Sequence, residues 1–321
     1  MKKILLYNSG GGLGDSIQLI PIILSIKNHY SNSEIYYLTS HTNHFAGKLK
    51  DFNLNLEELK INLKYFGFRW WHYLYLKNQK LTKFDLIIDL QSKIRNTLIL
   101  KQIPHSLFFS STFNFYFSKN KDIKFNTSKN FVENTIANLS LYTGEKIKKI
   151  DFNLKSIPKN YMKIAEEILP DNNYVGFSLT QGNLYRKKSW PLANFISLAK
   201  KILLNNDKPV FFIENKYADL INKIKNEVPQ AIFPEEQIKD PTPLMVTALA
   251  TRLNNSITID NGVMHMISLS KTPMIVLFGP TSSLKFAPKH DKIKIIDSKL
   301  IYDSNDITKL TVEDVLKNIN N

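Results

Sequence analysis

The sequence predicts an α/β protein with two doubly wound parallel sheets, and three observations support this fold class. Apolar, β-branched runs of strand length alternate with helix-length segments along most of the 321 residues. Glycine-rich or polar loops follow several of these runs, as is typical where a strand leads into a helix. The alternation starts again after an extended segment that ends at Pro158. We therefore expect one Rossmann-like domain over 1–155 and another over 156–321, with a ligand cleft between them.

The expected elements follow the chain in this order. A buried strand over 3–7, a loop over 8–15 and a helix over 16–30 come first, and Pro21 predicts a kink or a late start of that helix. Strands over 34–39 and 84–90 and a helix over 130–142 complete the first domain. The second domain is expected to have strands over 174–179, 209–213, 231–233, 256–259 and 274–278, and helices over 160–169, 192–204, 217–227, 243–253 and 264–270. Thr311-Val-Glu-Asp314 predicts a capping box for the terminal helix, which is a candidate to pack back on the first domain.

Composition excludes several classes of protein. A hydrophobic content of 43% and a charged content of 22% are ordinary for a soluble globular chain. Because there is no cysteine, the chain can have neither a disulfide framework nor a thiolate metal site. No apolar run approaches the ~20 residues of a membrane span, and the apolar run at the N-terminus is too short for a signal peptide. We expect a cytoplasmic protein.

The net charge of +15 favours an anionic partner, and one stretch concentrates both charge and aromatic rings. From Leu59 to Phe84 there is no acidic residue, whereas six residues are basic and eight are aromatic. This stretch is either a packed layer with lysines reaching to solvent, or a surface for anionic lipid or a glycolipid acceptor, with Arg69, Trp70 and Trp71 at its centre. Stacking on single-stranded nucleic acid is a third interpretation, but no nucleic-acid motif accompanies it and no nucleic-acid partner is expected.

The loop over 8–15 contains four of the eleven glycines and ends in Asp15. Its spacing is neither that of a dinucleotide fingerprint nor that of a phosphate-binding loop ending in Gly-Lys-Ser/Thr. Asp15 is either a first-turn carboxylate that stabilises the helix, or a carboxylate held where ligands of open α/β sheets bind.

The turn Asp260-Asn-Gly-Val-Met-His265 lies between the strand over 256–259 and the following helix. A helix N-terminus offers free backbone N–H groups and a positive dipole end, which together can hold phosphate. Gly262 allows a close backbone approach, and His265 can add a ring N–H. The alternative is a helix capped by Asp260 or Asn261, with His265 in the core.

The loop over 180–191 is cationic, with Arg186, Lys187 and Lys188 in sequence. A lysine here can neutralise a diphosphate, although a solvated basic loop is the alternative interpretation. We find no Asp-x-Asp triplet, no nucleophile elbow and no clustered histidines, so no metal and no cofactor are expected.

Four motifs in this order resemble those of the heptosyltransferase family, glycosyltransferase family nine. Gly14-Asp15 followed by Pro21 is similar to its Gly-Asp-x5-Pro motif, and Lys188-Ser-Trp-Pro191 to its Lys-x-Trp-Pro loop. The turn over 260–265 resembles its Asp-Ser/Thr-Gly-x-x-His signature, with Asn261 in place of Ser/Thr. Phe278-Gly-Pro-Thr281 resembles the family's closing strand and turn.

This resemblance implies a GT-B fold and an inverting, metal-independent transfer of heptose from ADP-heptose to a lipopolysaccharide core at the cytoplasmic face of the inner membrane. By position, Asp15 would be the general base that deprotonates the acceptor. The donor would be bound by Lys188, Thr180 and Gln181 at its phosphates, by Asn261, Gly262, Val263 and His265 around the diphosphate, and by Asp260 beside the sugar.

Two alternatives remain open from the sequence. One is a GT-B protein that does not transfer, such as a nucleotide-sugar epimerase. The other is a catalytically silent module that binds a sugar nucleotide or lipid. A binding module would tolerate Asp15→Asn, whereas a transferase that depends on this base would lose turnover.

Overall fold

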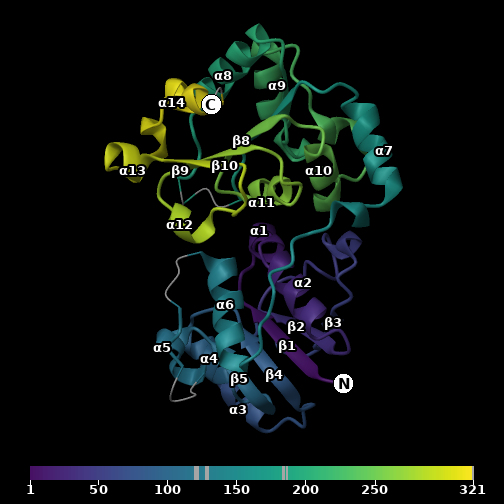
Figure 1. Cartoon of the computed structure of the whole chain (residues 1–321), viewed down its shortest axis with the longest axis vertical. Coiled ribbons are helices and arrows are strands. Elements are labelled where there is room, and N and C mark those ends of the chain that lie inside the picture. The colour runs from purple at the N-terminus through teal and green to yellow at the C-terminus, as the bar shows by residue number, and fades with distance from the viewer. Residues whose placement is uncertain (119–122, 127–129, 183–184, 186, 320–321) are drawn as a thin grey trace. The chain divides into compact units, whose positions relative to one another are not determined.

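The computed structural model describes residues 1–118, 123–126, 130–182, 185 and 187–319. The chain forms two compact units, Met1–Phe152 and Asn153–Asn321 (Figure 1). Each unit contains one five-stranded parallel sheet, with strand orders β3-β2-β1-β4-β5 and β10-β9-β8-β6-β7. The predicted fold class, α/β with two parallel sheets, is confirmed.

The first unit carries strands β1 to β5 and helices α1 to α6. Their bounds are β1 (Lys3–Asn8), α1 (Leu13–Ile17), α2 (Ile20–His29), β2 (Glu34–Thr39), β3 (Glu57–Glu58), α3 (Trp71–Lys77), β4 (Phe84–Asp89), α4 (Ile94–Leu100), β5 (His105–Ser110), α5 (Thr112–Phe115) and α6 (Phe131–Thr143). Strand β1 is buried from Ile4 to Asn8 because it pairs with both β2 and β4, and a central parallel strand has both faces covered. Pro21 was predicted to mark either a kink or a late helix start. It stands in the first turn of α2, so the helix starts late.

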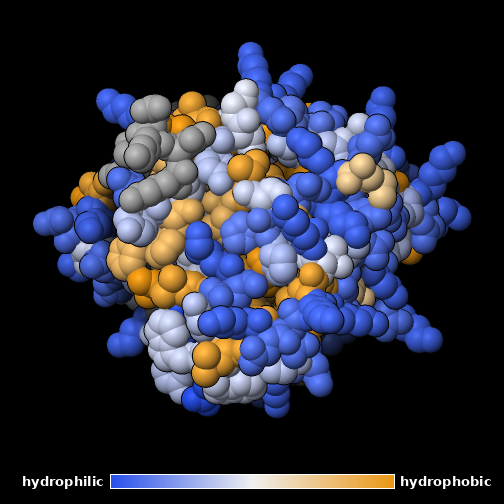
Figure 2. Space-filling model, turned by 90° about the horizontal axis from the view of Figure 1, so that it is seen from below, coloured by the Kyte–Doolittle hydropathy of each residue, from blue (hydrophilic) through white to orange (hydrophobic). Residues whose placement is uncertain are grey.

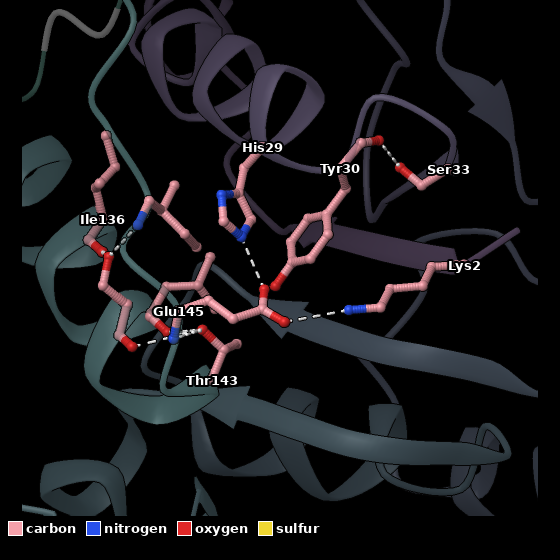
Figure 3. Close-up of polar contacts among 10 residues, drawn as sticks. Lys2, His29, Tyr30, Ser33, Ile136, Thr143 and Glu145 are labelled. Atoms are coloured by element: carbon pink, nitrogen blue, oxygen red, sulfur yellow. Dashed lines mark hydrogen bonds and ion pairs between the residues drawn. The ribbon is translucent and has the colours of Figure 1, made fainter.

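A polar cluster in the first unit joins three segments that are far apart in the sequence (Figure 3). Glu145, just after α6, accepts hydrogen bonds from His29 Nε2 at 2.8 Å and from Lys2 Nζ at 3.4 Å. Hydrogen bonds from Tyr30 and His29 lower the pKa of Glu145 to about 2. The cluster therefore ties the end of α2 and the chain before β1 to the end of α6.

The second unit carries strands β6 to β10 and helices α7 to α14. Their bounds are α7 (Lys159–Ile168), β6 (Tyr174–Ser178), α8 (Leu192–Leu204), β7 (Lys208–Phe211), α9 (Ala218–Glu227), α10 (Pro243–Ala250), β8 (Asn255–Ile259), α11 (Gly262–Ser268), β9 (Met274–Phe278), α12 (Ser283–Phe286), β10 (Ile293–Asp297), α13 (Ser298–Tyr302) and α14 (Val312–Ile319). The predicted segment over 231–233 forms only a single bridge, Val210 to Ile232.

The core of the second unit forms where α8, α9 and α14 lay their apolar residues on the sheet. Phe195 of α8 and Ile224 of α9 are fully buried in this cluster, as is Val315 of α14. Gly176 in β6 is required by packing, since a Cβ there would lie 2.6 Å from Leu253. The terminal helix α14 contacts α8, β9 and β10.

The predicted capping box of α14 is present. The Asp314 amide donates to Thr311 Oγ1 at 3.1 Å, and the Thr311 amide donates to Asp314 Oδ2 at 2.8 Å. No helix in the described part of the chain is long and apolar enough to cross a membrane.

Candidate active site

The polar loops of the second unit gather where strand order reverses. Strands β6 and β8 are neighbours, although β7 lies between them in the sequence. Ligands of open α/β sheets bind beyond the carboxyl ends of strands at such a switch point. The loop over 180–191 follows β6 and the turn over 260–265 follows β8, so both meet at this edge.

Lys188 and Asp260 form the charged centre of this edge. Lys188 Nζ lies 2.5 Å from Asp260 Oδ2 and 3.3 Å from the Asp260 carbonyl oxygen. The side chains are only 14% and 10% exposed. The Lys188 amide also donates to Gln181 Oε1 at 2.9 Å, which fixes the backbone that carries the lysine. The structure therefore brings three predicted donor-site residues into one bonded group.

Asn261 caps helix α11 and also links the two loops. Its Oδ1 accepts from the Met264 amide at 2.8 Å, as an N-cap side chain does. Its Nδ2 donates to Ser178 Oγ at 2.7 Å and to the Thr180 carbonyl at 2.9 Å. Because both amide hydrogens and the carbonyl oxygen are engaged, this side chain positions the turn rather than offering a free group to a ligand.

The first turn of α11 supplies backbone N–H groups at this edge of the sheet. Gly262 and Val263 occupy its first turn, where N–H groups have no partner within the helix. His265 lies in the same short helix and is buried, with 8% of its surface exposed. These first-turn residues follow closely on Asp260, the carboxylate that pairs with Lys188.

Trp190 anchors the cationic loop through its buried indole. The indole is 2% exposed, its Nε1 donates to the Leu310 carbonyl at 2.8 Å, and its ring meets Phe195 edge-on with centroids 5.0 Å apart. A cavity of about 380 Å³ adjoins the loop. Its lining includes Leu179, Thr180, Gln181, Trp190, Tyr217 and Thr308. Asn183, Leu184 and Arg186, which the sequence placed in this loop, lie outside the described residues.

Asp15 lies at the corresponding edge of the first sheet, in helix α1. Its Oδ2 accepts from the Gly12 amide at 3.2 Å, so the exposed carboxylate closes the first helical turn. A Cβ at Gly10 would lie 2.8 Å from Asp15 Cβ, which explains why glycine is needed in this loop.

A buried network holds the Asp15 loop at the switch point between β1 and β4. Asn8 Oδ1 accepts from the Gly10 amide at 2.9 Å and from Gln91 Nε2 at 2.6 Å. At the end of β4, burial raises the pKa of Asp89 to about 6, while hydrogen bonds from Thr97 and Ser110 oppose the rise. Asn8 and Gln91 therefore orient the loop that carries the carboxylate.

Comparison with known proteins decides the family. The pattern of Glycosyltransferase family 9 (heptosyltransferase) matches residues 75–316. The chain belongs to this family. The resemblance that the four motifs indicated is thus confirmed, and the enzyme is a glycosyltransferase of the heptosyltransferase type.

Individual relatives of this glycosyltransferase are distant. Lipooligosaccharide heptosyltransferase 2 of Campylobacter jejuni serotype O:2 is 23% identical over 291 residues, which cover 88% of this chain and 83% of the relative. A family 9 glycosyl transferase from Veillonella parvula aligns with a TM-score of 0.71 and 18% identity, over 99% of this chain and 96% of that one. Escherichia coli heptosyltransferase WaaC, solved with ADP, aligns with a TM-score of 0.70 and 12% identity, over 99% of both chains. These structures share the fold, so the expected GT-B class is confirmed.

The aromatic stretch of the glycosyltransferase is largely at the surface. Trp70 and Trp71 are 57% and 55% exposed and lead into α3, and Arg69 beside them is exposed as well. His72 and Leu76 on the same helix are buried. The stretch is therefore partly a packed layer, as one interpretation had it, and partly an open surface.

Sequence reasoning missed several residues that position the site. Asn8, Gln91 and Ser178 were not singled out, because each acts through a neighbouring strand rather than through a motif. The position of Asn8 and Ser178 at strand ends was the available signal. Among the described residues, no group of three His, Asp or Glu side chains lies close enough together to hold a metal ion.

Proposed function

We propose that this glycosyltransferase moves heptose from ADP-heptose to a lipopolysaccharide core or a related glycolipid, with inversion and without a metal. The observation that carries the proposal is the Lys188–Asp260 pair beside the α11 N-terminus, at the switch point of the second sheet. The Escherichia coli relative solved with ADP and the Campylobacter jejuni lipooligosaccharide heptosyltransferase support the donor and acceptor classes.

The proposed reaction is a single displacement at C1 of the sugar, in which each group of the site has one role. The acceptor oxygen forms a bond to C1 of the sugar while the bond from C1 to the diphosphate oxygen breaks. The acceptor proton passes to the Asp15 carboxylate, and the negative charge gathers on the departing diphosphate. Lys188 and the first-turn amides of Gly262 and Val263 stabilise that charge, with His265, Thr180 and Gln181 around the phosphates and Asp260 beside the sugar.

Asn261 has an indirect part in this scheme. Its side chain joins the turn after β8 to Ser178 and Thr180 at the end of β6, so it holds the two donor-binding segments at a constant separation. Lys188 enters the site already bonded to Asp260, and the donor's diphosphate then shares the lysine with that carboxylate.

The place of action is proposed from the same reasoning. A glycolipid acceptor requires the enzyme to work at a membrane surface, for which we propose the cytoplasmic face of the inner membrane, and a net charge of +15 suits an anionic surface. Arg69, Trp70 and Trp71 are the proposed acceptor and membrane contacts.

The Asp15→Asn variant tests the assignment of the base. We expect turnover with ADP-heptose and a lipopolysaccharide core acceptor to fall by about 10²–10⁴-fold, the usual contribution of a general base. Donor affinity, measured by calorimetry with ADP, should stay within about twofold because the amide is isosteric and lies in the other unit. Near-normal turnover of Asp15→Asn would remove Asp15 from the mechanism.

A panel of ADP-, UDP-, GDP- and dTDP-sugars tests the donor. Tightest binding and sole turnover with ADP-heptose are expected, and preference for another nucleotide would overturn the heptose assignment while leaving the family intact. Conversion of a nucleotide sugar without any acceptor would instead identify an epimerase.

A further inference from the structure

Glu235 is a carboxyl group inside the second unit that the proposed reaction does not use. It lies in the short 3-10 helix Pro234–Gln237, after the bridging segment 231–233 and before α10. Charged side chains ordinarily lie at the surface, and the face in Figure 2 is accordingly rich in hydrophilic residues. Glu235, by contrast, is only 5% exposed, and its Oε2 atom is buried without a hydrogen-bond partner among the described residues. Orphaned buried oxygens are uncommon in proteins and often mark a functional group.

Burial favours the neutral form of Glu235. An ionised carboxylate without a compensating charge is costly to bury, so such a group keeps its proton instead. Burial, with a smaller contribution from the Glu214 carboxylate, raises the pKa of Glu235 to about 8, although hydrogen bonds from the Glu235 and Ile213 amides oppose the rise. At neutral pH the side chain is therefore mainly a carboxylic acid.

The charged groups around Glu235 do not compensate a negative charge there. Lys216, in the 3-10 helix after β7, pairs with Glu214, and Lys225 of α9 pairs with Glu236 at 2.7 Å. The span of α10 contains no charged residue. The charged residues between Glu236 and α10 are both exposed: Lys239 and Asp240. An ionised Glu235 would therefore face the Glu214 carboxylate while Lys216 and Lys225 are already engaged.

Two contacts in opposite directions join Glu235 to the turn after β7. The Glu235 carboxyl accepts from the Ile213 amide just beyond β7, and Asn215 Nδ2 donates back to the Glu235 carbonyl at 3.0 Å. A bridge between β7 and the segment 231–233 holds the two stretches side by side. Because Glu214 lies between Ile213 and Asn215, its position depends on the Glu235 side chain.

The turn after β7 lies at the same edge of the sheet as the proposed donor site. β7 pairs with β6, and β6 pairs with β8, so this turn is two strand spacings, about 10 Å, from the turn that carries Asp260. In doubly wound sheets that bind dinucleotides, an acidic residue after the second strand binds the ribose. β7 is the second strand of this unit, and Glu214 follows it closely. The turn is therefore placed for the nucleoside part of a donor.

We propose that Glu235 is a positioning residue for nucleotide binding: as a neutral acid it holds the Glu214–Asn215 turn in place, and loss of its proton releases the turn and weakens donor binding. The proposal rests on the proposed function, because it assigns the nucleoside end of the donor to this turn. Glu235 is buried, so it acts through Glu214 and Asn215 and not by contact with the donor. The competing explanation is a structural acid whose protonation has no effect on nucleotide binding.

Urea unfolding at a series of pH values tests the protonation of Glu235. Its folded pKa of about 8 lies above the unfolded value of about 4.3, so its contribution to stability is full below pH 4.3 and is lost as the pH rises through 8. We expect the unfolding equilibrium constant of the parent, divided by that of Glu235→Gln, to rise about tenfold per pH unit between pH 6 and pH 8 and then to level off. Glu236→Gln, at the exposed neighbour that pairs with Lys225, is the matched control, and its ratio to the parent should stay constant.

Calorimetry with ADP between pH 6.5 and pH 9.5 tests the effect on the donor site. The Kd of the parent should be about tenfold higher at pH 9 than at pH 7, because only about a tenth of the molecules then keep the proton on Glu235. Glu235→Gln cannot ionise, so it should bind ADP as the parent does at pH 7 and keep that affinity at pH 9. Glu236→Gln should follow the parent at every pH. In turnover assays, the pH dependence that Glu235→Gln removes should appear in the KM for the donor and not in kcat.

A second variant checks the cause of the retained proton by stability alone. Glu214→Gln removes the carboxylate that faces Glu235, so the pH at which the unfolding constant stops rising should move downward. An unchanged pH would contradict the contact between the two carboxyl groups on which the proposal depends.

Three further results would overturn the proposal. One is a Kd for ADP that rises as steeply with pH in Glu235→Gln as in the parent. Another is ADP binding by the parent that does not change with pH although the unfolding ratio does, which would make Glu235 a structural acid only. The third is an unfolding ratio that stays constant between pH 6 and pH 8, which would show Glu235 to be ionised in the folded protein. Neither measurement requires the sugar or the acceptor, so a failure of heptose transfer would leave both results unaffected.

Discussion

Lys188, a residue of the proposed donor site, is paired with the Asp260 carboxylate, and this pairing determines how single substitutions will behave. Removing either partner leaves a largely buried charge without compensation, whereas removing both leaves a neutral site. The cation is therefore held at one place in the absence of any ligand. A bare surface lysine would have to be ordered by the ligand itself.

A double-mutant cycle on this pair follows from that argument. Lys188→Met and Asp260→Asn should each destabilise the protein by about 3 kcal/mol, the low end for a buried pair, in urea unfolding. The double variant should fall short of their sum by about 1–3 kcal/mol. The exposed Lys200–Glu227 pair is the matched control and should show almost no coupling. Additive single effects at Lys188 and Asp260 would contradict the pairing.

At the same scale, the sequence was sufficient to single out Lys188 and Asp260 but not their bond. Each lies in a recognisable motif, yet the two are 72 positions apart, and only the pairing of β6 with β8 brings them together. Local patterns do not encode strand order. The bonds of the Asn261 side chain to Ser178 and Thr180 depend on the same strand pairing, so the sequence did not predict them.

Elements with a strong periodicity of apolar residues and clear boundary residues were predicted well. Helix α8 and strand β9 have the predicted bounds, and Pro21 marks the late start of α2. Three strands escaped prediction, β3, β5 and β10, and all are edge strands that pair on one side only. Polar residues interrupt the apolar run of β5 and of β10, and β3 consists of two glutamates. Segment 231–233 has the composition of a strand but finds only one bridging partner.

Asn261→Ser tests the turn as an element. Serine matches the family pattern and can still cap α11, but it cannot also reach Ser178 and Thr180. We expect a loss of about 1–2 kcal/mol in urea unfolding and weaker ADP binding, because the loop after β6 is no longer tied to the turn.

The control for this variant is Asn153→Ser. Asn153 caps a short 3-10 helix by accepting from the Lys155 amide at 3.0 Å, and serine caps about as well. A change within about 0.5 kcal/mol is expected there. If Asn261→Ser were equally silent in both stability and ADP binding, the cross-link between the loops would have no energetic role.

On the scale of the whole molecule, a small number of polar clusters hold segments that are remote in the sequence. The Lys2–His29–Glu145 cluster is the clearest, because it joins the chain before β1, the end of α2 and the segment after α6 (Figure 3). Burial of apolar surface does not specify this connection, since all three segments end at the surface. Sequence patterns carried no sign of it.

Glu145 should therefore be visible in acid unfolding. Its pKa in the folded protein is about 2, below the ordinary glutamate value, because Tyr30 and His29 hydrogen-bond to the carboxylate and Lys2 lies beside it. A lowered pKa stabilises the fold at pH values above the unfolded pKa of about 4.3, and this contribution is lost as the pH falls toward 2.

The stability difference between the parent and Glu145→Gln should accordingly be full at pH 6 and shrink steadily between about pH 4.5 and pH 2. Urea unfolding at a series of pH values measures it, with Glu167→Gln, an exposed glutamate on α7, as a control whose difference should stay small throughout. A Glu145→Gln difference that did not change with pH would show that the carboxylate keeps its ordinary pKa in the folded protein.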